Sequence, residues 1–206
     1  MFIQTELTPN PASIKFIPDV SFVIDGSDTP NAVFDFSIEE PKAFEKVGLF
    51  GSPRAPLPAR LFAIAGVSRV MVAPDYVVVT KTDDSDWATL KSDVLIAVMD
   101  HLASGIVAVY VSKTMSNEGK NISLDGHRNL GLESHIRAII DTYIRPGVAS
   151  HGGDISLSHV IDGVVYLHLR GACAGCPSLK ITLKKGVETI LKAHIPEIVT
   201  VEAIAA

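Results

Sequence analysis

A polar stretch after the middle of the chain constrains the fold most, because it divides the 206 residues into two parts that each need a core of their own. Residues 110–131, YVSKTMSNEGKNISLDGHRNLG, contain three glycines and no sustained apolar period, which is the pattern of a linker. We therefore expect two small α+β domains, at 1–112 and 130–206, joined by a flexible linker at 113–129. The chain is long enough for both.

The first domain mixes strand and helix patterns. Strands are expected in MFIQTEL and SIKFIPDVSFVI, and a hairpin in VSRVMVA and YVVVTKT. Helices are expected over 57–65 and 86–103, the second with apolar residues at a spacing of three to four. His101 lies at the end of this second helix, where we expect it to be a cation favoured by the helix dipole rather than a catalytic group.

The second domain has the order helix, strand, strand, helix, strand. Leu132, Ile136, Ile139 and Tyr143 share one face of its first helix, which is expected to end at Arg145 because the residue before a proline avoids helical dihedrals. Pro177 suits the first position of the last helix, whose buried stripe is expected to comprise Leu179, Leu183, Val187 and Ile190.

The hairpin between these helices has alternating aliphatic residues at odd positions in both strands, up to Ile161 and from Val165. For these residues to share a face, the numbers of two opposed residues must add to an even number. A two-residue loop over Asp162 and Gly163 fails this test, because it pairs Ile161 with Val164 and their numbers add to an odd number. A three-residue loop over 161–163, with Gly163 left-handed, pairs Leu157 with Leu167 and is therefore predicted.

Charge and hydropathy exclude two classes of partner. Residues 1–112 hold 8 Lys and Arg against 14 Asp and Glu (net −6), and residues 113–206 hold 10 against 9 (net +1). This is not the basic stripe of a nucleic-acid binder; the acidic half is either a solvated surface or a docking face. No apolar run approaches the roughly 20 residues of a membrane helix. The start, MFIQTELTPNP, shows no export or organelle signal, so a cytoplasmic location, or a mature processed form, is expected.

The only two cysteines, Cys173 and Cys176, lie together in LRGACAGCPSLKITLKKG. Gly171 and Gly175 allow a sharp turn that would aim backbone amides at whatever the sulfurs hold. Cys176 precedes a helix, where the dipole favours the thiolate, the form that binds metal and attacks disulfides. The pair is thus a redox dithiol, half of a metal site, or two buried apolar residues.

The number of ligands narrows this choice. A zinc or iron–sulfur site takes four ligands, and one chain supplies two thiols. His168 is expected in mid-strand, His194 lies about 25 Å along the last helix from the loop, and His151 is expected on a surface turn. Two chains, each contributing one C-x-x-C across a two-fold axis, are the economical solution. A dithiol oxidoreductase and a zinc-stabilised interaction module remain open as alternatives.

Two sets of residues identify a family. IRPGVASHGGDISL, GVVYLHLRGACAGCPSLKITLKKGVETIL and IPEIVTVEAI resemble the carboxy-terminal domain of NifU-like (Nfu) iron–sulfur cluster carriers. TPNP, IKF, ARLFAIAGVSRVMVAPDYVVVTK and DWATLKSDVLIAVMDHLASG resemble the amino-terminal domain of mitochondrial and related bacterial Nfu proteins. One position departs from the family pattern, because His151 stands where an acidic residue usually precedes Gly-Gly-Asp.

The resemblance implies a function that needs no catalytic residue, and hence a protein that is not an enzyme. Cys173 and Cys176 would be the cluster ligands, in the G-x-C-x-x-C-P pattern of the family. A [4Fe-4S] cluster would be bound between two chains of a homodimer, with [2Fe-2S] as the alternative that takes the same four ligands. An upstream scaffold would donate the cluster and apo iron–sulfur proteins would accept it, in the cytoplasm of a bacterium or in the mitochondrial matrix. Lys180 would help to offset the negative charge, and the amino-terminal domain would serve targeting or recognition.

Overall fold

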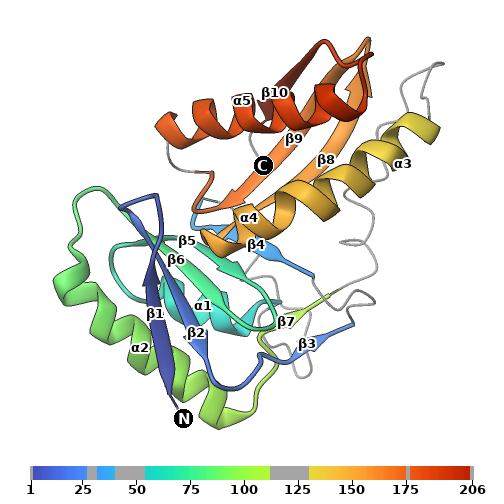
Figure 1. The fold of residues 1–206 in the computed structure, drawn as a ribbon. Helices are drawn as coiled ribbons and strands as arrows, with labels where there is room; N and C mark the ends of the chain where they lie inside the picture. Colours follow the sequence, from blue (N-terminus) through green and yellow to red (C-terminus); the bar gives the residue numbers. More distant parts are fainter. Residues whose placement is uncertain (1, 27–31, 40–53, 112–129, 175–176, 205–206) are drawn as a thin grey trace. The chain divides into compact units, whose positions relative to one another are not determined.

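The computed structural model describes residues 2–26, 32–39, 54–111, 130–174 and 177–204, apart from the side chains of 130 and 177–183. The chain forms two units, Met1–Ser116 and Asn117–Ala206. Each unit combines helices with a sheet, so the α+β class is confirmed (Figure 1). The linker predicted at 113–129 lies outside the described residues, and its bounds remain a prediction.

The first unit is built on a five-stranded antiparallel sheet of order β1-β2-β6-β5-β4. A parallel pair, β3 with β7, forms a separate two-stranded sheet. Two helices complete the described part. The bounds are β1 Ile3–Leu7, β2 Ser13–Pro18, β3 Ile24–Asp25, β4 Phe34–Ser37, α1 Pro56–Phe62, β5 Val67–Val72, β6 Val77–Lys81, α2 Trp87–Ser104 and β7 Val109–Tyr110.

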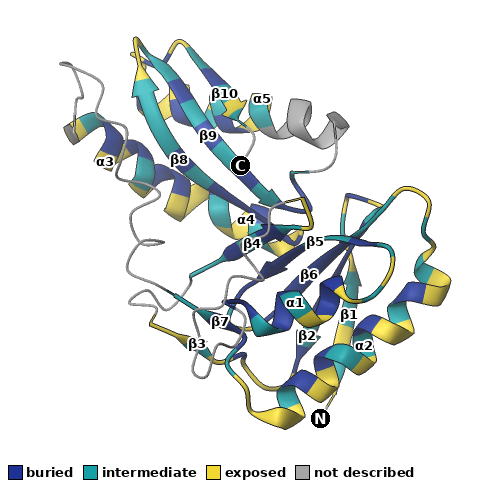
Figure 2. Cartoon of the chain, turned by 180° about the vertical axis from the view of Figure 1, so that it is seen from behind, coloured by how far each residue is buried: buried dark blue, intermediate teal, exposed yellow. Residues whose placement is uncertain are grey.

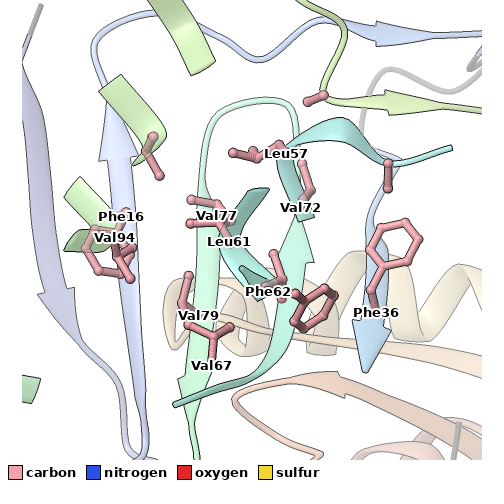
Figure 3. Close-up of a cluster of buried hydrophobic side chains, with 14 of the residues drawn as sticks. Phe16, Phe36, Leu57, Leu61, Phe62, Val67, Val72, Val77, Val79 and Val94 are labelled. Atoms are coloured by element: carbon pink, nitrogen blue, oxygen red, sulfur yellow. The ribbon is translucent and has the colours of Figure 1, made fainter. Parts of the chain in front are cut away.

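The core of the first unit lies between this sheet and the two helices (Figure 3). Phe16 of β2 and Leu61 of α1 are fully buried, and each such side chain contributes about 1.5–3 kcal/mol by leaving water. The stripe predicted for α2 is confirmed for Leu90, Val94 and Val98, and Figure 2 shows the alternation of buried and exposed positions along this helix. Asp86 caps α2, because its side chain accepts a hydrogen bond from the Ala88 amide at 3.3 Å.

The structure overturns the expectation for His101. His101 lies in the last turn of α2 as predicted, but its side chain is 2% exposed and packs inside the first unit. Burial, with a smaller effect of the Arg60 charge, lowers the pKa of His101 to about 4. The residue is therefore neutral at pH 7, since desolvation outweighs the attraction of the helix dipole for a cation.

The second unit has the predicted order of elements. The hairpin β8–β9 is antiparallel, and β10 joins β9 in parallel after the helical crossover α5, giving the order β10-β9-β8. The helices cover one face of this sheet and bury its aliphatic residues. The bounds are α3 Leu130–Ile139, η4 Ile140–Ile144, α4 Arg145–Ser150, β8 Gly153–Ile161, β9 Val164–Gly171, α5 Pro177–His194 and β10 Thr200–Ile204.

The first helix of this unit does not end at Arg145, contrary to the prediction. A π-helical turn, η4, precedes Pro146, and the Arg145 amide donates to the carbonyl of Ile140 five residues back. The wider turn accommodates the proline ring, which clashes with the preceding turn of a regular α-helix. It also shifts the buried face: Ile144 is buried where Tyr143, 60% exposed, was expected to be.

The hairpin loop is shorter than predicted, although the pairing of Leu157 with Leu167 is confirmed. Ile161 pairs with Val164 across a two-residue turn in which Asp162 and Gly163 both have positive φ, at 49° and 77°. This is the Asp-Gly turn that matches the twist of a hairpin. A bulge between Leu157 and His159 then restores the register, so the extra residue lies in the strand and not in the loop.

The last helix begins at Pro177 as predicted, and Val187 is buried. Leu191, fully buried, continues the stripe, while Ile190 is only partly buried. The side chains of Leu179 and Leu183 lie outside the described residues. None of the helices in the described ranges has the length and apolar character required to cross a bilayer.

Candidate metal centre at the cysteine loop

The cysteine loop leaves the end of β9 and leads into α5. At its start, the Ala174 amide donates to the Gly171 carbonyl at 3.1 Å, which closes a tight turn over 171–174. Cys173 lies inside this turn with 3% of its surface exposed and belongs to the core cluster of the second unit. Cys176 lies outside the described residues, one position before α5 begins. The structure therefore places one of the two predicted ligands.

The Cys173 side chain packs on the backbone of Gly153, the first residue of β8. A Cβ at Gly153 would overlap the Cys173 sulfur and come within 3.2 Å of Val148 Cγ1. The Ala172 amide also donates to the Gly152 carbonyl at 3.0 Å. The Gly-Gly turn and the cysteine loop are thus joined by packing and by a backbone hydrogen bond, and only glycine leaves room for the thiol.

The loop amides were predicted to point at whatever the two sulfurs hold. Two of those that the structure describes, on Ala172 and Ala174, instead donate to the carbonyls of Gly152 and Gly171. They stabilise the loop rather than a ligand. For these two positions the prediction is wrong, because their amides form the backbone hydrogen bonds that close the turn after β9 and join it to Gly152.

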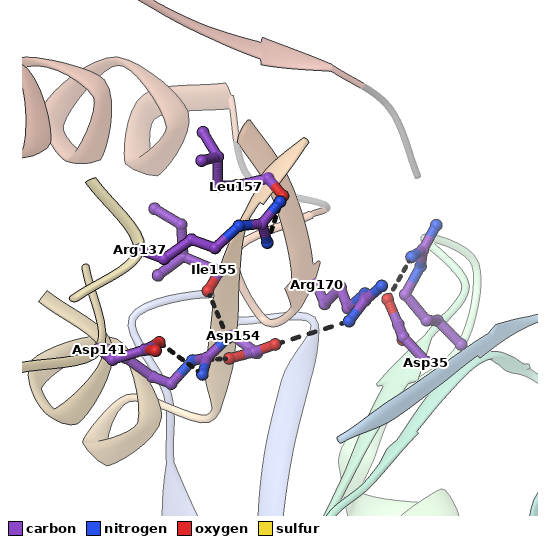
Figure 4. Close-up of polar contacts among 9 residues, drawn as sticks. Asp35, Arg137, Asp141, Asp154, Ile155, Leu157 and Arg170 are labelled. Atoms are coloured by element: carbon purple, nitrogen blue, oxygen red, sulfur yellow. Dashed lines mark hydrogen bonds and ion pairs between the residues drawn. The ribbon is translucent and has the colours of Figure 1, made fainter. Parts of the chain in front are cut away.

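A buried carboxylate, that of Asp154, lies next in sequence to Gly153, and Figure 4 shows it among its charged neighbours. Asp154 directly follows Gly153, is 4% exposed, and forms ion pairs with two arginines. Arg145 Nε lies 3.0 Å from its Oδ1, and Arg170 NH1 lies 3.8 Å from its Oδ2. Arg145 also pairs with Asp141 at 2.7 Å and donates to the Ile155 carbonyl at 3.1 Å. One guanidinium thus joins the helix to the edge strand β8.

Charged side chains connect α5, the helix that follows Cys176, to β10. Lys184 Nζ lies 2.7 Å from Glu202 Oε1. Glu188 accepts hydrogen bonds from Lys192 at 2.5 Å and from the Thr200 hydroxyl at 3.1 Å, and these two contacts lower the pKa of Glu188. These contacts fix α5 against the sheet beyond the cysteine loop. The Lys180 side chain, expected to offset cluster charge, lies outside the described residues.

The histidines considered as extra ligands do not gather at the loop. His151 is exposed at the end of α4, and His168 lies within β9 as predicted. His194 is the last residue of α5, where its ring lies tilted against that of Tyr143, with the ring centroids 5.0 Å apart. Within the described ranges, no three or more His, Cys, Asp or Glu side chains form a group that could hold a metal ion.

Three residues of this arrangement were not predicted as a unit. Gly153 and Asp154 were noted only as part of Gly-Gly-Asp, and Arg145 only as a helix end. The available signal was the apolar context of Asp154 at the start of a strand, because a carboxylate buried there requires a cation. The source of that cation, nine residues earlier, depends on the helix continuing through Pro146.

Comparison with known proteins identifies the family. Residues 136–202 match the model described as NifU-like domain, and residues 3–105 match the model described as scaffold protein Nfu/NifU N terminal. The human NFU1 iron-sulfur cluster scaffold homolog, mitochondrial, is 38% identical over 208 residues, which cover 99% of this chain and 72% of the relative. The chain belongs to the Nfu family of NifU-like proteins.

Two further relatives and one solved structure are similar to this chain to different extents. NifU-like protein 5, mitochondrial, of Arabidopsis thaliana is 37% identical over 98% of this chain and 67% of its own length. The Drosophila willistoni NFU1 homolog is 33% identical, and the chain spans 64% of it. The solution structure of a NifU-like protein from Saccharomyces cerevisiae aligns with a TM-score of 0.42 at 18% identity, over 53% of this chain and 84% of that one.

Proposed function

We propose that this protein is an iron–sulfur cluster carrier that binds a [4Fe-4S] cluster between two chains and passes it to apo-proteins. Cys173 and Cys176 of each chain would supply the four thiolates. The supporting observation is the number of ligands: the sequence contains two cysteines, and the described residues offer no group that completes a site within one chain. The names of the human and Arabidopsis relatives, a cluster scaffold and a NifU-like protein, agree with this role.

Cluster transfer would then proceed by exchange of ligands. A cluster held by two thiolates from each chain is easier to release than one held by four from a single chain, because separation of the chains breaks the site. An acceptor's thiolates would replace those of the dimer one at a time. This sequence of steps requires no catalytic acid, base or nucleophile, so the protein is proposed not to be an enzyme.

The burial of Cys173 adds a requirement. Because its side chain is 3% exposed in the single chain, the sulfur must leave the contact with Gly153, or the loop must open, before two chains can share a cluster. Donor and acceptor are proposed by class only, as an upstream cluster scaffold and apo iron–sulfur proteins. The compartment is proposed to be the bacterial cytoplasm or the mitochondrial matrix, the latter in keeping with the relatives' names.

Anaerobic reconstitution with iron and sulfide tests this proposal. We expect a brown holo-protein whose native mass is that of two chains plus one cluster, with iron and sulfide counts near two per chain. Replacing Cys173 or Cys176 with Ser should abolish cluster retention and leave the chain folded. A monomer that carries a complete cluster would refute the shared site. A colourless zinc protein, or turnover in an insulin-reduction assay, would instead support one of the alternative functions.

A further inference from the structure

The ion pairs of Asp154 lie where they can control the Cys173 thiol. Asp154 is fixed from two directions, by Arg145 at the start of α4 and by Arg170 on β9. A buried carboxylate that loses its cations is strongly destabilised, so these contacts hold the start of β8 in one position.

The start of β8 and the end of β9, the two strand ends near the Cys173 thiol, both adjoin residues of these ion pairs. Gly153, on which the sulfur packs, immediately precedes Asp154. On the opposite strand, Gly171 immediately follows Arg170, and it pairs with Gly153 in the sheet register just as Arg170 pairs with Asp154. The Asp154–Arg170 ion pair therefore joins β8 to β9 one position away from Gly153, on which Cys173 packs, and from Gly171, two residues before Cys173.

Arg145 adds a third element. Its guanidinium contacts Asp154, the Ile155 carbonyl and the exposed Asp141 on its own helix. The first two contacts reach β8, whereas the Asp141 contact stays on the helical segment. Val148, three residues after Arg145, has its Cγ1 3.2 Å from the position that a Cβ on Gly153 would occupy, next to the Cys173 sulfur. The arginine thus links the helix that carries Val148 to the strand that carries Gly153.

We propose that Arg145, Asp154 and Arg170 are positioning residues that hold the Cys173 thiol against Gly153 in the cluster-free chain. The inference deepens the proposed function and rests on it only in one respect, that the positioned thiol is a cluster ligand. The ion pairs set how readily the sulfur leaves its buried position. Weakening them would expose the thiol more often in the cluster-free chain and so speed its capture of a cluster.

The first test measures the thiol without any cluster. In a full-length Cys176→Ser chain, Cys173 is the only thiol, and its alkylation by iodoacetamide at one fixed pH reports how often it becomes exposed. Asp154→Asn should raise the alkylation rate about tenfold, because local opening becomes easier while the chain stays folded. Arg145→Lys keeps the charge but not the forked geometry, so it should lie between the parent and Asp154→Asn.

Two control variants separate positioning from general destabilisation. Asp141→Asn removes the other partner of Arg145 and should leave the alkylation rate within about twofold. Val201→Ala weakens the core at β10, where Val201 is 1% exposed, and should lower the midpoint of urea unfolding without raising the alkylation rate under native conditions. An unchanged rate in Asp154→Asn, or an equal rise in either control, would overturn the proposal.

A second measurement keeps this inference distinct from the proposed function. With both cysteines present, Asp154→Asn should gain cluster absorbance during anaerobic reconstitution several-fold faster than Asp141→Asn, because its Cys173 thiol is exposed more often. If alkylation responds as expected but no variant, including the parent, ever binds a cluster, the positioning role stands and the carrier function fails. If clusters assemble and neither the alkylation rate nor the rate of cluster uptake responds to Asp154→Asn, the positioning role fails alone.

Discussion

The two units use polar groups in different ways. In the first unit, which contains no cysteine, buried polar contacts connect neighbouring strands, as in the 2.8 Å hydrogen bond between the hydroxyls of Ser13 and Thr80. In the second unit, the buried carboxylate Asp154 adjoins the glycine on which Cys173 packs. Both folds combine helices with a sheet, but only the second places a buried charge beside a candidate ligand. We therefore expect function in this chain to depend on the buried charge and the close packing around Cys173, and not on the α+β fold that both units share.

Core variants should give the largest effects and test whether the two units are energetically separate. Leu61→Ala in the first unit and Leu191→Ala in the second each remove a fully buried side chain and should cost about 2–5 kcal/mol of unfolding free energy. Urea unfolding followed by circular dichroism measures this loss.

The alkylation rate of Cys173 then shows where each effect acts. Under conditions in which the second unit remains folded, Leu61→Ala should leave that rate unchanged. A Leu61→Ala chain whose Cys173 reacts as fast as an unfolded control would contradict the separation of the two units.

Acid should weaken the first unit through His101. Its folded pKa, about 4, lies below the ordinary value of 6.5, so the unfolded state binds the proton more tightly. The contribution of neutral His101 to the unfolding free energy of the first unit is therefore fully present above pH 6.5. It is lost as the pH drops toward 4, by up to about 3 kcal/mol. Urea unfolding at several pH values should show this slope, and His101→Gln should remove it. An equal slope in the variant would assign the acid sensitivity to other groups.

A pair of glycine substitutions gives the smallest and most local contrast, within the second unit. Gly153→Ala forces a methyl group onto the Cys173 sulfur and should cost about 1–3 kcal/mol, with faster alkylation of the thiol. Gly147→Ala, on α4 with no atom within 4 Å of the added carbon, should be neutral or stabilising by up to about 1 kcal/mol. Thermal unfolding and alkylation compare the two. Similar behaviour of both variants would argue against the close packing of the thiol.

Sequence reasoning was most successful where one periodic pattern decides the outcome. The alternation of aliphatic residues predicts the pairing of Leu157 with Leu167, and the order of elements in the second unit follows from the same patterns. The loop length was wrong because two solutions satisfy the alternation, and the local preference of Asp162-Gly163 for a two-residue turn selects the one with a bulge.

The remaining errors involve tertiary context. A proline predicts a helix end, but a π-helical turn before Pro146 lets the helix continue and brings Arg145 to Asp154. The burial of His101 and of Cys173 depends on residues distant in sequence, so no local pattern reveals it. The candidate ligands could be chosen from the sequence, whereas the contacts that hold one of them could not.

Mixing of chains tests the central claim, a cluster shared by Cys173 and Cys176 of two chains, most directly. Parent chain and a mass-tagged chain with both cysteines replaced by Ser are combined at equal amounts, reconstituted anaerobically, and resolved by native mass spectrometry. The account predicts that every cluster-bearing dimer contains two parent chains and that the tagged chain stays free of cluster. A dimer of one parent and one tagged chain that carries a complete cluster would contradict it.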